Sequence, residues 1–243
     1  MKIAIAGSTG LVGTQLAELA RERGHEVVGI ARQTGFDLLV GGDELTNALQ
    51  GVEAVIDVTQ SPAADETAAE FFVQVAKNLG GAATAAGVGR TVVLSIVGAD
   101  LSPDYGYYVA KVVQEDAMRE HAPGTTILRA TQFHEFAGQM LSWNTADGVA
   151  KIWDVPIQPV AISEIISVLL DMATGAVTGD VDLAGPRREN LVDLVRRFAT
   201  HAGSDVAVEA IAGPDSFAGG SMLPGPNAVV RGPDWQTWLD AQA

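Results

Sequence analysis

Three side chains of this sequence, those of Ser95, Tyr107 and Lys111, have the types and the spacing for proton transfer. Tyr107 and Lys111 are four residues apart in a segment that predicts a helix, so both lie on one helical face. Ser95 ends a strand-like run, at the edge where parallel sheets bind ligands. A tyrosine has a pKa of about 10, and a lysine ammonium beside it stabilises the phenolate and lowers this pKa. With a serine hydroxyl to hold a carbonyl oxygen, the three groups suit hydride transfer to or from a nicotinamide.

The first thirteen residues indicate a site for the pyrophosphate of a dinucleotide. Ile3 and Ile5 predict a short buried strand, and apolar residues recur at helical spacing after three glycines. Gly7 permits a tight turn, Gly10 lets the backbone approach the phosphates, and Gly13 allows the helix to pack close to the sheet. The phosphates would lie on the unpaired N–H groups at the start of that helix. The residues expected to bind the cofactor here are Gly7, Ser8, Thr9, Gly10, Leu11, Val12 and Gly13.

The end of the second predicted strand favours NADP(H) over NAD(H). Sites for NAD usually place a carboxylate there to bind the adenosine ribose hydroxyls, whereas this chain has Ala31 followed by Arg32. A guanidinium binds a 2′-phosphate through paired hydrogen bonds and can stack on adenine. We therefore expect NADPH to be preferred over NADH; the alternative is that Arg32 is only a solvated loop residue.

The chain resembles the atypical short-chain dehydrogenases/reductases, and within them the NmrA-like, NAD(P)-binding branch. The resemblance covers about residues 1–200 and rests on the glycine turn, on Leu94-Ser95, on Tyr107-x-x-x-Lys111 and on the segment 128–133. It implies that Tyr107 is the acid/base, that Lys111 also binds the nicotinamide ribose, and that Ser95 anchors the carbonyl. It further implies a cofactor-lining loop at Thr59, Gln60 and Ser61 after the fourth strand, and a nicotinamide border at 130–133 that includes Thr131 and Phe133. Many members of this branch have lost the tyrosine and only sense nucleotides.

Strand-like and helix-like segments alternate through the first half of the chain, which predicts a Rossmann-type α/β fold with a doubly wound parallel sheet. After the first strand and helix, the expected strands are 26–31, a short third strand between residues 32 and 53, and then 53–58, 91–95 and 125–129. The expected helices are 44–50, 65–86 and 107–119. Beyond residue 132 we expect helices at 134–142, 162–173, 190–202 and 234–240, strands near 149–153 and 180–184, and an irregular Pro/Gly-rich tail over 212–233. The predicted domains are an NAD(P)-binding domain at 1–132 and a small C-terminal α+β substrate lobe at 133–243.

The composition excludes several classes of protein. The chain has no cysteine, which excludes disulfides and thiolate chemistry, and no His/Asp/Glu cluster has metal-ligand spacing. A net charge of −15 argues against a nucleic-acid partner. The chain has no run of about 18 apolar residues, which is the length that could span a membrane. Near the N-terminus, the glycine turn interrupts the apolar run that a signal peptide would need. We therefore expect a cytoplasmic protein that binds a small molecule and neither a metal, a membrane nor a nucleic acid.

These features together predict an NADP(H)-dependent oxidoreductase that acts on a carbonyl, an alcohol or a quinone-like small molecule. The first alternative is a non-catalytic NADP(H) sensor, and the second is a nucleotide-sugar epimerase or dehydratase that keeps its cofactor bound. His134 and Glu135 either face the substrate or only begin a helix, and Trp143 and Trp153 either line the substrate pocket or pack in the core. The sequence leaves the substrate and the oligomeric state open.

Overall fold

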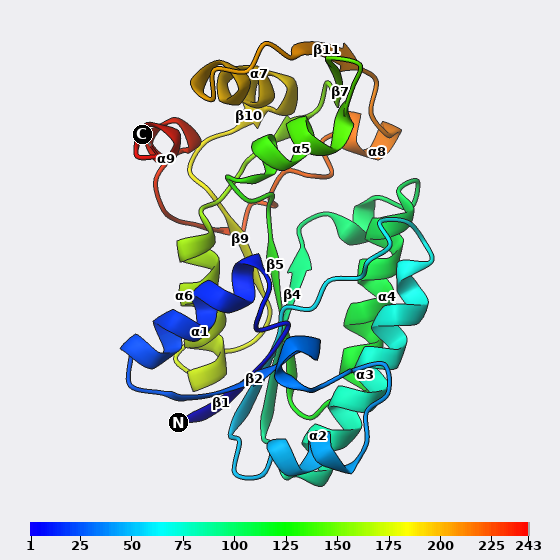
Figure 1. Ribbon diagram of the computed structural model, residues 1–243, viewed down its shortest axis with the longest axis vertical. Coiled ribbons are helices and arrows are strands. Elements are labelled where there is room, and N and C mark those ends of the chain that lie inside the picture. Colours follow the sequence, from blue (N-terminus) through cyan, green and yellow to red (C-terminus); the bar gives the residue numbers. More distant parts are fainter. Residues whose placement is uncertain (243) are drawn as a thin grey trace. The chain divides into compact units, whose positions relative to one another are not determined.

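The structure, a computed structural model, describes residues 1–242 and contains a seven-stranded parallel sheet (Figure 1). The strands are β1 (Lys2–Ala6), β2 (Glu26–Ile30), β3 (Ala54–Asp57), β4 (Arg90–Ile96), β5 (Thr125–Ala130), β9 (Val181–Ala184) and β12 (Val229–Val230). Ile3 of β1 pairs with Val27 of β2 on one side and with Ala54 of β3 on the other. Strands β1 and β3 are short apolar runs because both faces of a parallel sheet are covered.

The order of the strands creates a ligand site by topology. The order is β12-β9-β5-β4-β3-β1-β2, so the chain runs from β1 outward to β2 and then returns to the other side of β1 with β3. This reversal makes the carboxyl ends of β1 and β3 a topological switch point, where open α/β sheets bind ligands. The predicted Rossmann-type, doubly wound fold is confirmed.

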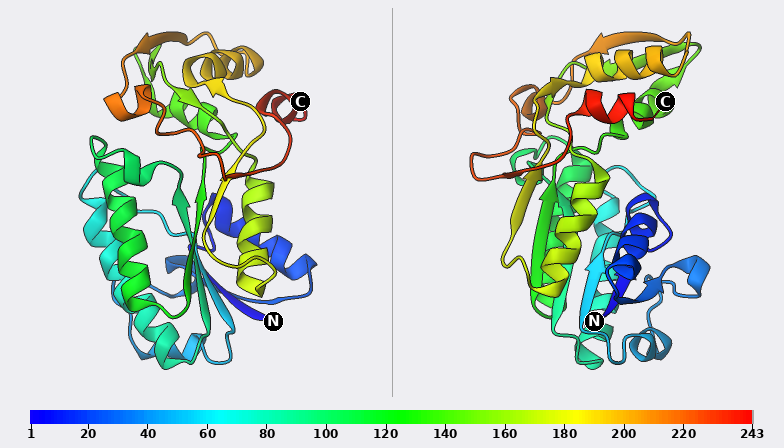
Figure 2. Two further views of the ribbon diagram at one scale, coloured as in Figure 1. Left: turned by 180° about the vertical axis from the view of Figure 1, so that it is seen from behind. Right: turned by 90° about the vertical axis from the view of Figure 1, so that its left-hand side faces the viewer.

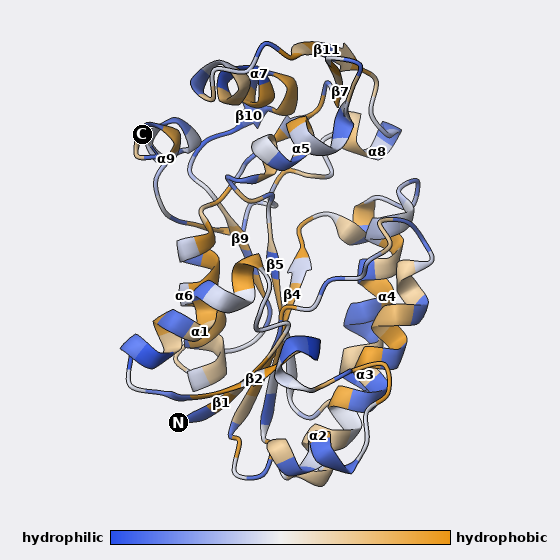
Figure 3. Ribbon diagram, viewed as in Figure 1, coloured by the Kyte–Doolittle hydropathy of each residue, from blue (hydrophilic) through white to orange (hydrophobic). Residues whose placement is uncertain are grey.

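Helices cover both faces of the sheet. In the views of Figures 1 and 2, α1 (Leu11–Glu22) and α6 (Ile162–Thr174) lie on one face, and α3 (Ala68–Ala85) and α4 (Gly106–His121) lie on the other. Figure 3 shows apolar segments, in orange, along the strands between these helices, interrupted by pale and blue ones. Leu16 of α1 and Phe72 of α3 are fully buried, and burying such a side chain stabilises the fold by about 1.5–3 kcal/mol relative to exposing it. Shorter elements connect these layers, namely η1 (Arg32–Thr34), α2 (Asp43–Ala48) and η2 (Ala99–Leu101).

The chain forms two compact units, and each is described by itself. The first contains residues 1–95, 105–129 and 165–181, and the second contains 96–104, 130–164 and the residues from 182 onward. The remaining elements, all in the second unit, are α5 (Phe136–Asn144), β6 (Thr145–Ala146), β7 (Val149–Trp153), β8 (Pro156–Ile157), β10 (Glu189–Asn190), α7 (Leu191–His201), β11 (Ala207–Ile211), α8 (Asp215–Ala218) and α9 (Trp235–Asp240). Here β11 pairs parallel to β7, and β8 pairs antiparallel to β10. Side-chain oxygens of Asn190 and Asp234 cap α7 and α9. The predicted domain boundary at residue 132 stays a prediction.

The predicted elements agree with the structure to within a few residues, with three corrections. The segment between β2 and β3 holds η1 and α2 and no strand, so the loop Thr59–Ser61 follows the third strand and not the fourth. The strand β11 and the two-residue strands β6, β8 and β10 were not expected. The predicted irregular tail over 212–233 contains α8 and β12. The strand β12 extends the sheet by pairing with β9, which lies more than forty residues earlier in the chain.

No helix built by residues 1–242 is both long enough and apolar enough to cross a membrane.

Candidate active site

The glycine turn has the geometry that its residue types predict, with one refinement. Gly7 has φ +82°, and a Cβ at this position would lie 2.8 Å from the carbonyl oxygen of Val58, just after β3. A Cβ at Gly13 would lie 2.1 Å from the carbonyl oxygen of Gly7. Gly13 is therefore required because α1 packs closely against the glycine turn, and not because it packs against the sheet. Only glycine fits both positions without a backbone shift.

The start of α1 offers unpaired donors at the switch point. Gly10 is the N-cap residue, and neither a side-chain cap nor an acidic residue occupies the first turn. The N–H groups of a helix start carry partial positive charge and bind anions. Two buried hydroxyl oxygens, Ser8 Oγ in the glycine turn and Thr59 Oγ1 just after β3, have no hydrogen-bond partner among the described residues. These observations fit the phosphates of a dinucleotide.

Several of the other predicted cofactor residues of the first unit are exposed to solvent. Arg32 is exposed at the first position of η1, directly after Ala31. Gln60 and Thr9 are exposed as well, and Leu11 is 48% exposed although it is apolar. Val12 is buried and faces the core. Thr9 and Leu11 of the glycine turn are therefore exposed to solvent, whereas Val12 packs into the core.

Tyr107 is half-buried at the start of α4, and its surroundings do not lower its pKa. Its ring packs against Phe72, with ring centroids 6.3 Å apart. Burial, with a smaller contribution from Tyr105, raises the pKa of Tyr107 to about 12. The expected lowering of this pKa by Lys111 is wrong for the structure as it stands, because desolvation disfavours the phenolate.

Lys111 is buried, and its ammonium is held by two acceptors. Its Nζ donates to the carbonyl oxygen of Leu94, 2.9 Å away on β4, and to Oε1 of Gln114. It also lies 5.0 Å from the centre of the Phe72 ring. Burial lowers the pKa of Lys111 to about 8, and the charges of Asp57 and Glu115 oppose that shift. Four apart on one helix, Tyr107 and Lys111 both contact Phe72 of α3.

Ser95 is also buried, and its hydroxyl has a protein partner. Ser95 Oγ donates to Glu115 Oε1 across 2.5 Å, and Glu115 in turn accepts two hydrogen bonds from Arg129, at 2.9 and 2.7 Å. The Glu115 side chain is 3% exposed and that of Arg129 is 24% exposed. In this arrangement the Ser95 hydroxyl can hold a carbonyl oxygen only by exchanging its bond to Glu115.

The second unit holds the remaining residues that the sequence singled out. Thr131 is buried, and its hydroxyl donates to the carbonyl oxygen of Gln158 across 2.6 Å. Phe133 is half-buried and forms an isolated β-bridge with Val160. His134 is fully buried, with Nε2 3.2 Å from the Pro159 carbonyl oxygen, and burial lowers its pKa to about 4.

The two tryptophans considered for a substrate pocket differ. Trp153 packs edge-on against Phe217, with centroids 5.7 Å apart, which is a packing role. Trp143 is 63% exposed at the end of α5. Neither is shown to line a pocket.

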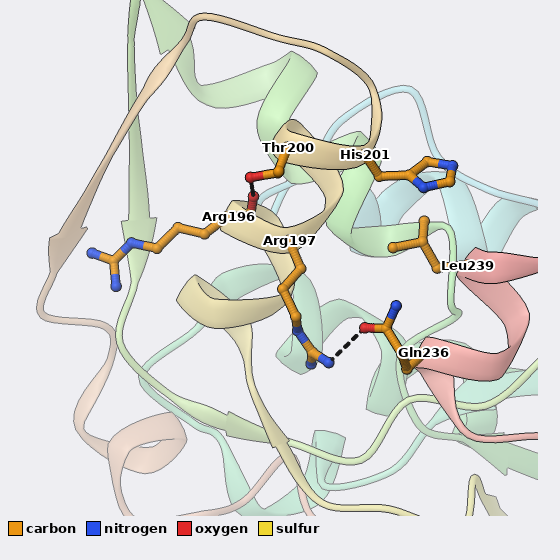
Figure 4. A pocket seen from close by; sticks show the side chains of 6 residues that line it. All are labelled: Arg196, Arg197, Thr200, His201, Gln236 and Leu239. Carbon is orange, nitrogen blue, oxygen red and sulfur yellow. Dashed lines mark hydrogen bonds between the residues drawn. The ribbon is translucent and has the colours of Figure 1, made fainter. Parts of the chain in front are cut away.

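A hollow of about 330 Å³ lies in the second unit between α7 and α9 (Figure 4). Figure 4 shows Arg197 pointing toward Gln236, to which it donates across 3.0 Å. Arg197 also pairs with Glu189 at 2.7 Å and stacks over the Trp235 ring at 4.9 Å. The Arg197 guanidinium is therefore already paired, and its bond to Gln236 links α7 to α9.

Residues that the sequence prediction did not include complete the site. Asp57, Gln114 and Glu115 are all buried. Gln114 accepts from Lys111, Glu115 accepts from Ser95, and Asp57 accepts from Gln114. The signal for two of them was spacing, since Gln114 and Glu115 lie three and four residues after Lys111 and so share its side of the helix. For Asp57, the only signal in the sequence was a charged residue at the end of an otherwise apolar strand. Within residues 1–242, no three His, Cys, Asp or Glu side chains are grouped so as to hold a metal ion.

The N-terminal part of the chain matches a described family. Residues 3–97 match the sequence model of the NAD dependent epimerase/dehydratase family. A protein of Bos taurus named Epimerase family protein SDR39U1 is 36% identical over 58 residues, which is 24% of this chain and 20% of that protein. The match thus spans about a fifth of that relative's length.

Solved structures resemble this fold over nearly the whole chain. A dTDP-4-dehydrorhamnose reductase from Clostridium acetobutylicum has a TM-score of 0.72 at 19% identity, covering 88% of this chain and 85% of its own. A UDP-N-acetylglucosamine 4-epimerase from Bacillus cereus has a TM-score of 0.72 at 14% identity, covering 99% and 94%. An NADPH-dependent quinone oxidoreductase from Escherichia coli, complexed with NADPH, has a TM-score of 0.66 at 23% identity, covering 86% and 78%. At these identities the likeness establishes the fold.

Proposed function

We propose that this chain is an NADP(H)-dependent oxidoreductase that transfers hydride between the nicotinamide and a small carbonyl, alcohol or quinone-like molecule. The observation that carries the proposal is a continuous line of contacts from the glycine turn to Lys111. Gly7 closely approaches Val58, the neighbouring Asp57 accepts from Gln114, and Gln114 accepts from Lys111. The end of β3 thus joins the predicted phosphate site to the lysine below Tyr107. The family match over residues 3–97 supports the same cofactor class.

The chain's own residues would bind the cofactor and supply a proton. When bound, the reduced nicotinamide supplies the hydride. Leu94 and Gln114 take two of the three N–H donors of Lys111, which leaves the third for a ribose hydroxyl. The raised pKa of Tyr107 keeps its proton in place at neutral pH, so Tyr107 acts as the proton donor in the direction of reduction.

The preference for NADPH is part of this proposal. Ala31 offers no carboxylate to the adenosine ribose, and the exposed guanidinium of Arg32 stands next to it. A bidentate contact with a 2′-phosphate would give that preference its physical basis.

The test combines cofactor binding with turnover. Calorimetry should show binding of NADPH to the purified chain, and a panel of carbonyls and quinones should identify a substrate that oxidises NADPH. Tyr107→Phe should then lower turnover by about a hundredfold or more, the usual contribution of a positioned acid or base, with NADPH affinity little changed. Tyr108→Phe is the matched control, since the next residue projects from another side of α4, and should retain activity.

Two outcomes would contradict the proposal. Undiminished turnover in Tyr107→Phe would remove the tyrosine from the mechanism. Tight NADPH binding without turnover of any acceptor would favour the non-catalytic sensor.

A second candidate is an epimerase or dehydratase that keeps its cofactor bound. The match of residues 3–97 to the NAD dependent epimerase/dehydratase family favours it. Such an enzyme would convert a nucleotide sugar with no net consumption of NADPH, so following the nucleotide-sugar product and NADPH absorbance together separates the two candidates.

A further inference from the structure

The Lys111 ammonium is held by a buried chain of hydrogen bonds that ends at a carboxylate. Lys111 Nζ donates to Gln114 Oε1, and Gln114 Nε2 donates to Asp57 Oδ2 across 2.9 Å. Asp57 and Gln114 are both 0% exposed. Buried polar groups lose their hydration, so each of these bonds has to be satisfied inside the protein.

Asp57 determines which way the Gln114 amide faces. A carboxylate only accepts hydrogen bonds, so Gln114 must turn its NH₂ group to Asp57 and its oxygen to Lys111. The second carboxylate oxygen, Oδ1, accepts from the backbone N–H of Thr59 across 2.9 Å. That bond shapes the turn that leads from β3 into the Thr59–Ser61 loop. One carboxylate therefore fixes two parts of the candidate site.

We propose that Asp57 and Gln114 are positioning residues, which hold the Lys111 ammonium and the Thr59 turn in one fixed relation at the end of β3. The inference rests on the proposed function, in which Lys111 binds the cofactor and the Thr59 loop lines it.

The groups around Lys111 single out Gln114 as the side chain that positions it. The other groups around the Lys111 ammonium are Asp57 of β3, Glu115 of its own helix, the uncharged ring of Phe72 on α3, and the Leu94 carbonyl of β4. Glu115 is already bonded to Ser95 and Arg129. Gln114 is thus the side chain whose oxygen contacts the ammonium, and Asp57 acts on Lys111 through it.

Two single variants break the chain at different points. Gln114→Leu removes the acceptor of Lys111 and the donor of Asp57. In Asp57→Asn, the new amide keeps its oxygen on the Thr59 N–H and turns its NH₂ toward Gln114. The Gln114 amide must then reverse and present NH₂ to the ammonium, which is repulsive. Both variants should destabilise the charged form of Lys111.

A double variant, Asp57→Asn with Gln114→Glu, should restore the arrangement. It exchanges the amide and the carboxylate between the two positions, so that the amide at 57 donates to the carboxylate at 114 and that carboxylate accepts from Lys111. The net charge and the shapes of the side chains are unchanged. If Asp57 and Gln114 only filled space, the double variant and the single variants would have the same effect on Lys111.

The experiment measures the titration of Lys111 directly in the intact chain. With ¹³C at the lysine ε carbons, NMR shows only four signals, from Lys2, Lys77, Lys111 and Lys151, and Lys111→Arg assigns the relevant one. We expect the Lys111 midpoint to fall by about one pH unit or more in each single variant, the effect of losing a charged hydrogen bond, and to return in the double variant. NADPH affinity should fall about tenfold in the singles and recover likewise.

The control is Asn78→Leu, the same amide-to-leucine change on α3, where Asn78 donates to the Leu38 carbonyl. It should leave the Lys111 midpoint unchanged. An unshifted midpoint in Gln114→Leu, or no recovery in the double variant, would overturn the inference. If the unmodified chain binds no dinucleotide, the proposed function fails, while the Lys111 titration still decides whether Asp57 and Gln114 position that lysine.

Discussion

Arg32 is the residue on which cofactor choice depends. Its guanidinium is exposed beside Ala31, so it can reach a 2′-phosphate without breaking a contact recorded in the structure. We expect Arg32→Ala to weaken NADPH binding about tenfold or more, the value of a charge-assisted hydrogen bond, and to leave NADH binding unchanged. Calorimetry with both nucleotides checks this. Arg21→Ala, which removes an exposed arginine at the end of α1, should change neither affinity, and an equal loss for NADPH and NADH in Arg32→Ala would refute the assignment.

Residue types and spacing predicted Tyr107 and Lys111 as neighbours on one helix, but not their electrostatics. The pKa of Tyr107 depends on how deeply its ring is buried against Phe72, and burial is decided by how α3 packs on α4. The partners of Lys111 come from β3 and β4 as well as from its own helix. A side chain such as Asp57 becomes part of the site only once the strand order places it there.

At the scale of elements, the turn between β1 and α1 depends on a missing side chain. A Cβ at Gly13 would lie 2.1 Å from the Gly7 carbonyl oxygen, so Gly13→Ala should push α1 away from the turn. We expect a loss of about 1–3 kcal/mol in unfolding free energy, as for other overpacked sites, together with a loss of NADPH affinity. Gly81→Ala in α3 is the matched control, because a Cβ there meets nothing within 4 Å. It should stabilise the protein by about 0.5–1 kcal/mol, as measured by urea denaturation followed by circular dichroism.

Local pattern was enough to predict the βα units, because their apolar strands and amphipathic helices each carry their own signal. It was not enough for β11 and β12. Strand β11 is mostly exposed and lacks a clear alternation, and it exists because β7 offers it a parallel partner. Strand β12 is two residues long and depends on β9. Elements defined by a distant partner leave little trace in their own residues.

On the scale of the whole molecule, the two units carry different chromophores. Trp143, Trp153, Trp235 and Trp238 all lie in the second unit, and Tyr105, Tyr107 and Tyr108 all lie in the first. Tryptophan fluorescence therefore reports on the surroundings of side chains in the second unit, where the buried imidazole of His134 lies.

His134 should make the second unit sensitive to mild acid. Burial lowers the pKa of His134 from 6.5 to about 4, so between these values the unfolded chain binds a proton that the folded chain does not. Stability then falls as pH falls from about 6.5 to 4, by at most about 3 kcal/mol from this group. Burial raises the pKa of Glu135, which acts in the opposite direction. His134→Gln keeps a donor for the Pro159 carbonyl but cannot titrate, so its urea midpoint, followed by tryptophan fluorescence, should fall less between pH 6.5 and 4. Parallel curves for the two proteins would show that His134 does not carry this acid sensitivity.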